Sequence, residues 1–303
     1  MTRAFLFPGQ GIAIERSVAE WCACSVNVRR LVDVAAHEVG VDREHLLARG
    51  GRALARTELL QPVLTGLCLG IHLDLAERGV RPDVVAGHSL GELAACAAGG
   101  AFAAEDALAL AAERGRLMAR QASLHPGGML VTCADEAEVA RAVADARRHG
   151  LVAIAAYNSP TQIAVSGDRT GLARVRELIR TAPLAVSGPW HSPAMAGAVD
   201  EFRRRVACVA LAPLRCRWIS NRTGDVVERV EDIPALLAEQ LNHPVQWVRS
   251  MHAMVRNGVT DVFTIGPARI LRGLVRDSLG QAPGVRPIEN PQAMDAWAQG
   301  SVA

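Results

Sequence analysis

The sequence predicts a mixed α/β protein in which a small β-α-β-β-α-β unit interrupts a larger α/β body. Short apolar runs with strand character alternate with long helical patterns, as is typical of α/β proteins. After the Pro-Gly-Gly sequence at 126–128 the elements shorten, and from about residue 190 the longer pattern returns. We therefore expect residues 1–125 and 190–303 to form the larger part, and residues 126–189 the inserted part.

Composition favours a globular protein with a core of small side chains. Of the 303 residues, 50% are hydrophobic and only 4% aromatic, and the net charge is +2. This balance indicates neither a nucleic-acid nor a membrane partner. The apolar run at the N-terminus is too short for a signal peptide, and we expect no span of roughly 20 apolar residues. The predicted location is the cytoplasm, and the seven irregularly spaced cysteines are expected to be reduced and to bind no metal.

All 33 basic residues are arginine, because the chain contains no lysine. A Ser-Lys dyad, a Schiff base, a pyridoxal phosphate linkage and a Walker A loop each need a lysine. These four kinds of chemistry are therefore excluded.

In the larger part, a first strand at 5–7 ends at the turn Pro-Gly-Gln-Gly. Apolar spacing predicts helices near 15–38, 57–78 and 104–122. A short strand at 83–86 and a helix at 92–98 enclose a glycine-bounded turn. The last strand is expected at 262–265, and a helix follows Gly266-Pro267. The tail from about 281 is rich in Pro, Gly and Ala and is expected to be peripheral.

The smaller part reads as a ferredoxin-like unit, since its elements follow the order β-α-β-β-α-β. We expect its strands at 129–132, 152–156, 162–167 and 184–186, a turn at 158–160, and helices at 136–148 and 170–180.

The turn at 87–91, GHSLG, has the Gly-x-Ser-x-Gly form of a nucleophile elbow. Two glycines permit a sharp strand-to-helix turn that presents Ser89 at its tip. The helix N-terminus beneath offers free N–H groups to a developing negative charge. The alternative is a glycine-bounded turn that carries a serine with no catalytic role.

Further motifs accompany this elbow in a fixed order. They are FPGQG at 7–11, GHSLGE at 87–92, ERGRLM at 113–118, NSP at 158–160 with VSG at 165–167, HSP at 191–193 and PVQW at 244–247. Over roughly residues 3–280 the chain resembles the malonyl-CoA:acyl carrier protein transacylase family, which includes the acyltransferases of polyketide synthases. The resemblance implies an α/β-hydrolase-like body with a ferredoxin-like insert.

The resemblance also implies residue roles. Ser89 would be the nucleophile that holds the acyl group as an ester, and His191 its general base and acid. In the family a backbone carbonyl orients this histidine, and Gln246 occupies the position that we match to it. A carbonyl can fix the histidine tautomer as a carboxylate does. Gln246 equally suits a helix-capping or packing role.

Gln10 and Leu90 match the residues whose backbone N–H groups form the oxyanion hole. Arg114, 25 residues after Ser89, matches the arginine that binds the free carboxylate of malonyl. A guanidinium suits this task because it binds a carboxylate bidentately and keeps its charge in a pocket. Asn158 is assigned to substrate binding by the same match. Alternatively, Arg114 would be a solvated helix residue.

Two segments depart from the family pattern. Residues 12–16 read IAIER, where the family commonly has a Ser/Ala-Gln pair and a Gly-Met-Gly turn. Trp190 precedes His191, where malonyl-selective relatives tend to carry Phe and branched-substrate relatives Ser. We expect Trp190 to fill the space that an α-methyl group needs, or else to indicate an unusual acyl group.

The sequence therefore predicts a ping-pong enzyme that moves malonyl from malonyl-CoA to the phosphopantetheine thiol of an acyl carrier protein, in trans, in fatty acid or polyketide biosynthesis. No further cofactor is expected. The alternatives are a hydrolase that clears stalled acyl groups, a transferase of another acyl group between carrier proteins, and an inactive partner-binding subunit. The carrier protein and the oligomeric state stay open, with a monomer as one option.

Overall fold

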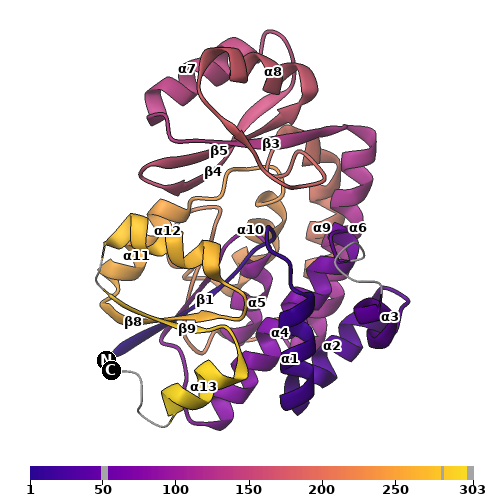
Figure 1. The fold of residues 1–303 in the computed structure, drawn as a ribbon, viewed down its shortest axis with the longest axis vertical. Coiled ribbons are helices and arrows are strands. Elements are labelled where there is room, and N and C mark those ends of the chain that lie inside the picture. The colour runs from indigo at the N-terminus through magenta and orange to yellow at the C-terminus, as the bar shows by residue number, and fades with distance from the viewer. Residues whose placement is uncertain (49–53, 281–282, 299–303) are drawn as a thin grey trace.

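The computed structural model describes residues 1–48, 54–280 and 283–298. It contains a parallel sheet surrounded by helices and a separate antiparallel sheet, which lies at the top of Figure 1. The expected mixed α/β class is confirmed. The strands of the antiparallel sheet all come from within residues 126–189, and those of the parallel sheet from outside that range.

The parallel sheet forms the centre of the larger part. Its order is β7-β2-β1-β8-β9, and each neighbouring pair is parallel. The strands are β1 (Thr2–Phe7), β2 (Val84–Gly87), β7 (Arg217–Ile219), β8 (Val259–Ile265) and β9 (Gly284–Ile288). Because β1 and β2 are parallel neighbours, their carboxyl ends meet at one edge, where open α/β sheets bind ligands. The turns after Phe7 and Gly87 therefore lie side by side.

Helices cover this sheet and form most of the remaining body (Figure 1). They are α1 (Glu15–Cys24), α2 (Val26–Glu38), α3 (Arg43–Ala48), α4 (Thr57–Glu77), α5 (Gly91–Ala98), α6 (Ala104–Leu124), α9 (Ala196–Ala207), α10 (Ile233–Glu239), α11 (Trp247–Arg256), α12 (Arg269–Leu279) and α13 (Pro291–Ala298). Contrary to our expectation, α4 is long and apolar enough to cross a membrane, but 78% of its apolar window is buried inside the protein. A core helix of a globular protein has this character.

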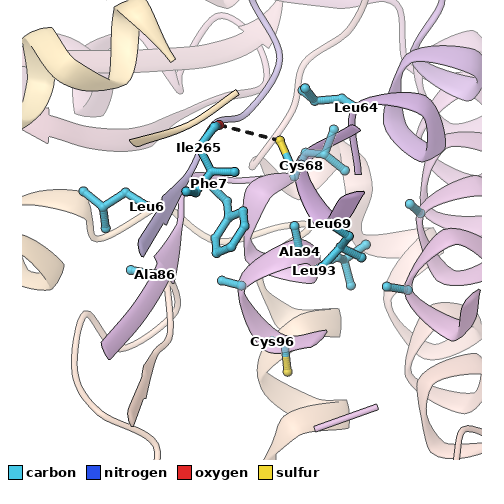
Figure 2. Packing of buried hydrophobic residues seen from close by; sticks show 14 of the residues in the cluster. Leu6, Phe7, Leu64, Cys68, Leu69, Ala86, Leu93, Ala94, Cys96 and Ile265 are labelled. Carbon is cyan, nitrogen blue, oxygen red and sulfur yellow. Dashed lines mark hydrogen bonds between the residues drawn. The ribbon is translucent and has the colours of Figure 1, made fainter. Parts of the chain in front are cut away.

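The core between the parallel sheet and its helices consists of closely packed apolar side chains (Figure 2). Phe7 of β1 and Leu93 of α5 are almost fully buried there. The thiol of Cys68, on α4, donates to the carbonyl oxygen of Ile265 at 3.8 Å and so ties α4 to the end of β8 (Figure 2). Each large apolar side chain buried in this way contributes roughly 1.5–3 kcal/mol.

The antiparallel sheet has the order β4-β5-β3-β6, and α7 and α8 pack against it. Its elements are β3 (Gly127–Thr132), α7 (Glu136–Ala146), β4 (Val152–Ser159), β5 (Gln162–Asp168), α8 (Arg169–Leu178) and β6 (Ala182–Pro183). The β-α-β-β-α-β sequence of elements is the predicted one. The side chains of Asp135 and Asp168 cap α7 and α8 by accepting backbone N–H bonds.

Main-chain hydrogen bonds join this small sheet to the larger part. The backbone N–H of Tyr157 donates to Val245 at 2.9 Å, and the N–H of Val245 donates to Ala155 at 2.9 Å. These two bonds make a parallel bridge between β4 and the loop that leads into α11.

Several expectations about elements were wrong. The helix at 15–38 is two helices, because Ser25 is extended and its hydroxyl accepts the N–H of Val28 as the N-cap of α2. The fourth small strand lies at 182–183, not 184–186. The tail is not peripheral, since β9 pairs with β8 and Met294 of α13 is buried. Pro287 is compatible with β9 because β9 is an edge strand.

Candidate active site

The turn between β2 and α5 has the geometry of a nucleophile elbow. Ser89 takes a positive φ of 53°, which a non-glycine residue rarely adopts without support from its surroundings. A Cβ at Gly87 would lie 1.9 Å from the carbonyl oxygen of Gly91, and one at Gly91 would lie 2.2 Å from that of Phe7. Only glycine fits at either position, so the two glycines of the motif are what permit the turn.

His191 lies against Ser89, although 102 residues separate them in the sequence. Nε2 of His191 is 2.7 Å from the Ser89 hydroxyl oxygen, and Nδ1 is 2.8 Å from the carbonyl oxygen of Gln240. The carbonyl can only accept, so Nδ1 carries the proton and Nε2 is free to accept from Ser89. This arrangement makes the imidazole a base for the hydroxyl.

The carbonyl that orients His191 belongs to Gln240, which corrects our assignment of Gln246. Gln240 follows the last residue of α10, where helix carbonyls lack intrahelical partners and can accept from elsewhere. The carbonyl of Gln246 instead accepts from the backbone and the hydroxyl of Ser250 in the first turn of α11. Gln246 stands at the N-cap position of α11, and its side chain makes no capping hydrogen bond there.

Burial keeps His191 neutral. The side chain is only 4% exposed, and burial, together with the nearby charge of Arg114, lowers its pKa to about 3. The Gln240 carbonyl opposes the shift. His191 is therefore unprotonated at neutral pH and available to accept a proton.

Arg114, on α6, is a buried cation beside the serine. It is 1% exposed, and its Nη2 lies 3.4 Å from the Ser89 hydroxyl oxygen. The guanidinium donates to the side-chain oxygens of Gln61 at 2.8 Å and Gln240 at 2.7 Å. Burial lowers its pKa to about 10 and the charge of Glu92 opposes this, so Arg114 stays charged at neutral pH. The alternative of a solvated helix arginine is wrong.

The backbone N–H groups of Gln10 and Leu90, both near Ser89, make no hydrogen bond to the described residues. Leu90 directly precedes α5, and Gln10 follows β1. The two turns are in close contact, because a Cβ at Gly9 would lie 2.7 Å from the carbonyl oxygen of His88. The Gln10 side chain is held by the Thr57 hydroxyl at 3.0 Å.

His88 does not act on Ser89 in this arrangement. Its Nε2 lies 2.9 Å from the amide oxygen of Asn158, and its ring packs edge-on against Trp247. Burial lowers the pKa of His88. Asn158, at the end of β4 and not in the turn we expected, also donates to Gln162 at 3.2 Å.

A cavity of about 170 Å³ lies between the loop after β1, α12 and the segment that follows β6. Its walls are mainly apolar, with Gln10, His88 and Asn158 among the polar groups. The full lining is Pro8, Gly9, Gln10, Gly11, Ile12, His88, Asn158, Gln162, Leu184, Ala185, Val186, Pro267, Ala268, Ile270, Leu271 and Leu274. The divergent residue Ile12 thus forms part of the wall.

Trp190 is buried, with 4% of its surface exposed. A Cβ at Gly188 would lie 2.4 Å from the indole ring and 2.8 Å from Cβ of Ala122. The ring therefore packs over Gly188 and near α6, and its N–H has no hydrogen-bond partner among the described residues.

Sequence reasoning assigned no role to four polar residues around the elbow, Gln61, Glu92, Asn221 and Gln240. Glu92 was part of the GHSLGE motif, so its position offered a signal. Gln61, Asn221 and Gln240 are distant from Ser89 in the sequence, and only the fold brings them to the site. Across residues 1–48, 54–280 and 283–298 there is no group of three or more His, Cys, Asp or Glu side chains that could hold a metal ion.

Comparison with known proteins places this geometry in a family. The acyl transferase domain family matches residues 5–284. The malonyl CoA-acyl carrier protein transacylase of Bacillus subtilis is 33% identical, over 90% of this chain and 89% of its own. The crystal structure of an acyl-carrier-protein S-malonyltransferase from Burkholderia pseudomallei is 31% identical, with a TM-score of 0.91 over 99% of this chain and 100% of its own.

A third similar structure is a type II polyketide synthase acyl carrier protein in complex with its malonyl-transacylase. It is 25% identical, with a TM-score of 0.91 over 99% of this chain and 100% of the other. The match of sequence and fold extends over nearly the whole chain and includes every segment that builds the site. The chain belongs to the acyl transferase family.

Proposed function

We propose that this protein is a malonyl-CoA:acyl carrier protein S-malonyltransferase. The observation that carries the proposal is the buried guanidinium of Arg114, 3.4 Å from the hydroxyl of Ser89, which is itself paired with a neutral histidine. An uncharged acyl group would leave that buried cation without an anionic ligand. A malonyl group supplies a carboxylate that can bind it while the thioester carbonyl approaches Ser89.

In the first half-reaction, His191 Nε2 takes the proton of Ser89 as the serine oxygen attacks the thioester carbonyl. The negative charge on the resulting tetrahedral oxygen is stabilised by the backbone N–H groups of Gln10 and Leu90. Each such donor typically contributes a factor of about 10²–10³ in rate. The carbon–sulfur bond then breaks, and the CoA sulfur leaves with the proton returned by His191.

In the second half-reaction, the phosphopantetheine thiol of an acyl carrier protein gives its proton to His191 and attacks the seryl ester. The ester bond breaks, the malonyl thioester forms, and Ser89 recovers its proton from His191. The cycle as proposed uses no cofactor beyond the two substrates. The relatives that carry the names above support the choice of malonyl-CoA and acyl carrier protein.

We assign the reaction to fatty acid or polyketide biosynthesis in the cytoplasm, with the chain supplying malonyl in trans. Support comes from the names of the relatives, such as the Bacillus subtilis transacylase, and from the polyketide carrier-protein complex. Trp190 is proposed to restrict the acyl pocket to unbranched malonyl. Asn158 is proposed to contact the substrate, since it lines the cavity beside His88.

The main competing function is hydrolysis of stalled acyl groups on carrier proteins, in which water attacks the seryl ester. The retained Arg114 favours transfer of a charged acyl group over such clearance. A further alternative is transfer of another acyl group between carrier proteins.

The deciding experiment follows the intact mass of the protein after incubation with malonyl-, methylmalonyl- and acetyl-CoA. We expect a malonyl adduct that is stable in buffer, is absent from Ser89→Ala, and is discharged when holo-carrier protein is added. Rapid loss of the adduct to water alone would support the hydrolase instead. A stable adduct from acetyl-CoA but not malonyl-CoA would refute the role of Arg114.

A further inference from the structure

Glu92 is a fully buried carboxylate directly beneath the elbow. It is the second residue of α5 and has 0% exposure. One carboxylate oxygen accepts the backbone N–H of Asn221 at 2.6 Å, and the other accepts the side-chain N–H of Gln240 at 2.6 Å. The side chain of Ser220 also bonds to it. Glu92 therefore joins the elbow to the segment after β7 and to the end of α10.

The first of these connections acts on the backbone of Ser89. The amide oxygen of Asn221 accepts the N–H of Ser89 at 2.7 Å, and its amide nitrogen donates to the carbonyl of Gly87 at 2.6 Å. Both bonds hold the elbow in the positive-φ conformation that Ser89 would otherwise avoid. Because Glu92 holds the backbone of Asn221 in place, it also positions the Asn221 side chain that makes both bonds.

The second connection acts on all three groups of the site. The amide nitrogen of Gln240 also donates to the carbonyl of Ser89 at 2.7 Å, and its amide oxygen accepts from Arg114 at 2.7 Å. Its backbone carbonyl accepts from His191 at 2.8 Å. One residue thus contacts the serine, the histidine and the arginine.

Burial raises the pKa of Glu92 to about 7, while its hydrogen-bond donors and the Arg114 cation favour the charged form. That charge sets the orientation of the Gln240 amide. A carboxylate can only accept, so it requires the nitrogen of Gln240 on its side and leaves the oxygen facing Arg114. The reverse orientation would direct an oxygen at Glu92 and an NH₂ group at the Arg114 cation. Every partner of Glu92 is a donor, and the charged or titratable groups that face it are Arg114, from α6, and Cys96, on its own helix.

We propose that Glu92 is a positioning residue for acyl transfer. Its carboxylate orients the Gln240 amide and Asn221. These two residues in turn hold Arg114, His191 and Ser89 in their relative positions. It touches neither substrate nor reacting atoms. The inference rests on the proposed function only for the choice of acyl substrate, because the geometry of Ser89 and His191 can be tested without one.

The test is a reciprocal exchange. Glu92→Gln directs an NH₂ group at Gln240 or Asn221, and Gln240→Glu directs a second carboxylate at Glu92. The double variant restores a donor facing an acceptor between positions 92 and 240 and keeps an oxygen facing Arg114. It leaves the Ser89 carbonyl without the donor that Gln240 supplied, so we expect the recovery to be partial. Glu113→Gln is the matched control, since Glu113 lies on the surface and pairs with Arg116.

Two rates are measured for each variant. One is malonyl transfer to holo-carrier protein, as kcat and KM. The other is labelling of Ser89 by a fluorophosphonate, which needs the Ser89–His191 pair but no acyl carboxylate. If wild-type protein is labelled but transfers no malonyl, the proposed function fails while the labelling rates still test this inference.

We expect each single variant to lose roughly 10- to 100-fold in both rates, the size of one lost hydrogen bond to a charged group. For malonyl transfer, Glu92→Gln should also raise KM, because Arg114 loses its fixed partner. The double variant should recover at least about fivefold over the poorer single variant, and the control should match wild type. If a single variant does not fold, the double variant alone decides by its recovery of folding and labelling.

Two outcomes would overturn the proposal. The first is a folded Glu92→Gln protein whose two rates stay within about twofold of wild type, even if its melting temperature falls. The second is a double variant no better than the poorer single variant, since additive losses show that the two side chains act independently.

Discussion

The hydroxyl oxygen of Ser89 and Nη2 of Arg114 lie 3.4 Å apart. The atom proposed to attack and the group proposed to bind the acyl carboxylate therefore border the same small space. In malonyl the carboxylate is separated from the thioester carbonyl by a single methylene, so a short separation between the two protein groups is what this substrate requires.

Replacing Arg114 should change which acyl groups are accepted. Arg114→Met removes the cation and keeps the length of the side chain. We expect kcat/KM for malonyl-CoA to fall roughly 100-fold, because one or two hydrogen bonds to a charged group are lost, while acetyl-CoA is affected less. Steady-state rates with both donors measure this, and Arg116→Met on the exposed side of α6 is the control. An unchanged ratio of malonyl to acetyl rates would contradict the assignment.

Reducing the side chain at position 190 should admit a branched acyl group. Trp190→Phe removes an indole N–H that bonds to none of the described residues, so little stability should be lost with it. Trp190→Ser opens more space. We expect the rate ratio of methylmalonyl to malonyl transfer to rise from wild type to Phe to Ser, by roughly tenfold overall. Equal rates with both substrates in wild-type protein would refute the steric role.

The pH dependence of the Ser89 reaction should show no loss from His191 near pH 6.5. Burial and Arg114 lower the pKa of His191 to about 3, so the base stays deprotonated from neutral pH down to strongly acidic pH. Arg114→Met removes a repelling charge and should raise this pKa, moving the acid limb to higher pH. Fluorophosphonate labelling rates between pH 4 and 8 should show no His191 limb in wild-type protein, and they measure any limb that Arg114→Met moves into this range. Glu92, whose pKa burial raises to about 7, titrates in this range too, so the contradicting result is a limb near 6.5 that persists in Glu92→Gln.

The side chain of Gln246 should be dispensable. It forms no hydrogen bond to the described residues, and the backbone carbonyl of Gln246, which accepts from Ser250, remains after Gln246→Ala. We expect kcat within about twofold of wild type. Gln240→Ala keeps the carbonyl that bonds His191 but removes the amide that bonds Arg114 and Ser89, and it should lose roughly 10- to 100-fold. The opposite ranking of these two variants would contradict the role of the Gln240 side chain.

The elbow glycine should be irreplaceable for stability. In Gly87→Ala, the added Cβ would lie 1.9 Å from a backbone carbonyl, so strand and helix must separate, and we expect a loss of at least about 3 kcal/mol. Gly273→Ala, within α12, meets no atom within 4 Å and should stabilise by roughly 0.5–1 kcal/mol. Urea unfolding of both variants measures the difference, and a mild effect at Gly87 would contradict the tight turn.

Local patterns predicted the elements that depend on local chemistry. The turn at 87–91 was identified because its glycines, its strand and its helix are contiguous, and the β-α-β-β-α-β order was legible for the same reason. The helix break at Ser25 was missed because an apolar pattern continues on both sides of a cap. The edge strand β9 was missed because Pro and Gly are typical of loops, although an edge strand tolerates both.

The site itself was predicted unevenly. Ser89, His191 and Arg114 lie together as expected, since the motifs that contain them were matched as a set. The carbonyl partner was misplaced by six positions, from Gln240 to Gln246, because only the end of an unpredicted helix, α10, distinguishes the two. Glu92, Asn221 and Gln61 act across the fold, and no spacing in the sequence links them.

The bridge between β4 and Val245 has a practical consequence for chimaeric enzymes. Val245 follows Gln240 by only five residues, so the insert that carries Asn158 is connected through main-chain bonds to the segment that orients His191. Exchanging residues 126–189 alone between relatives would place a foreign strand against a native partner. A graft that also transfers residues 240–246 keeps both sides of the bridge from one parent. Such a graft should disturb the active site less when acyl selectivity is exchanged between relatives.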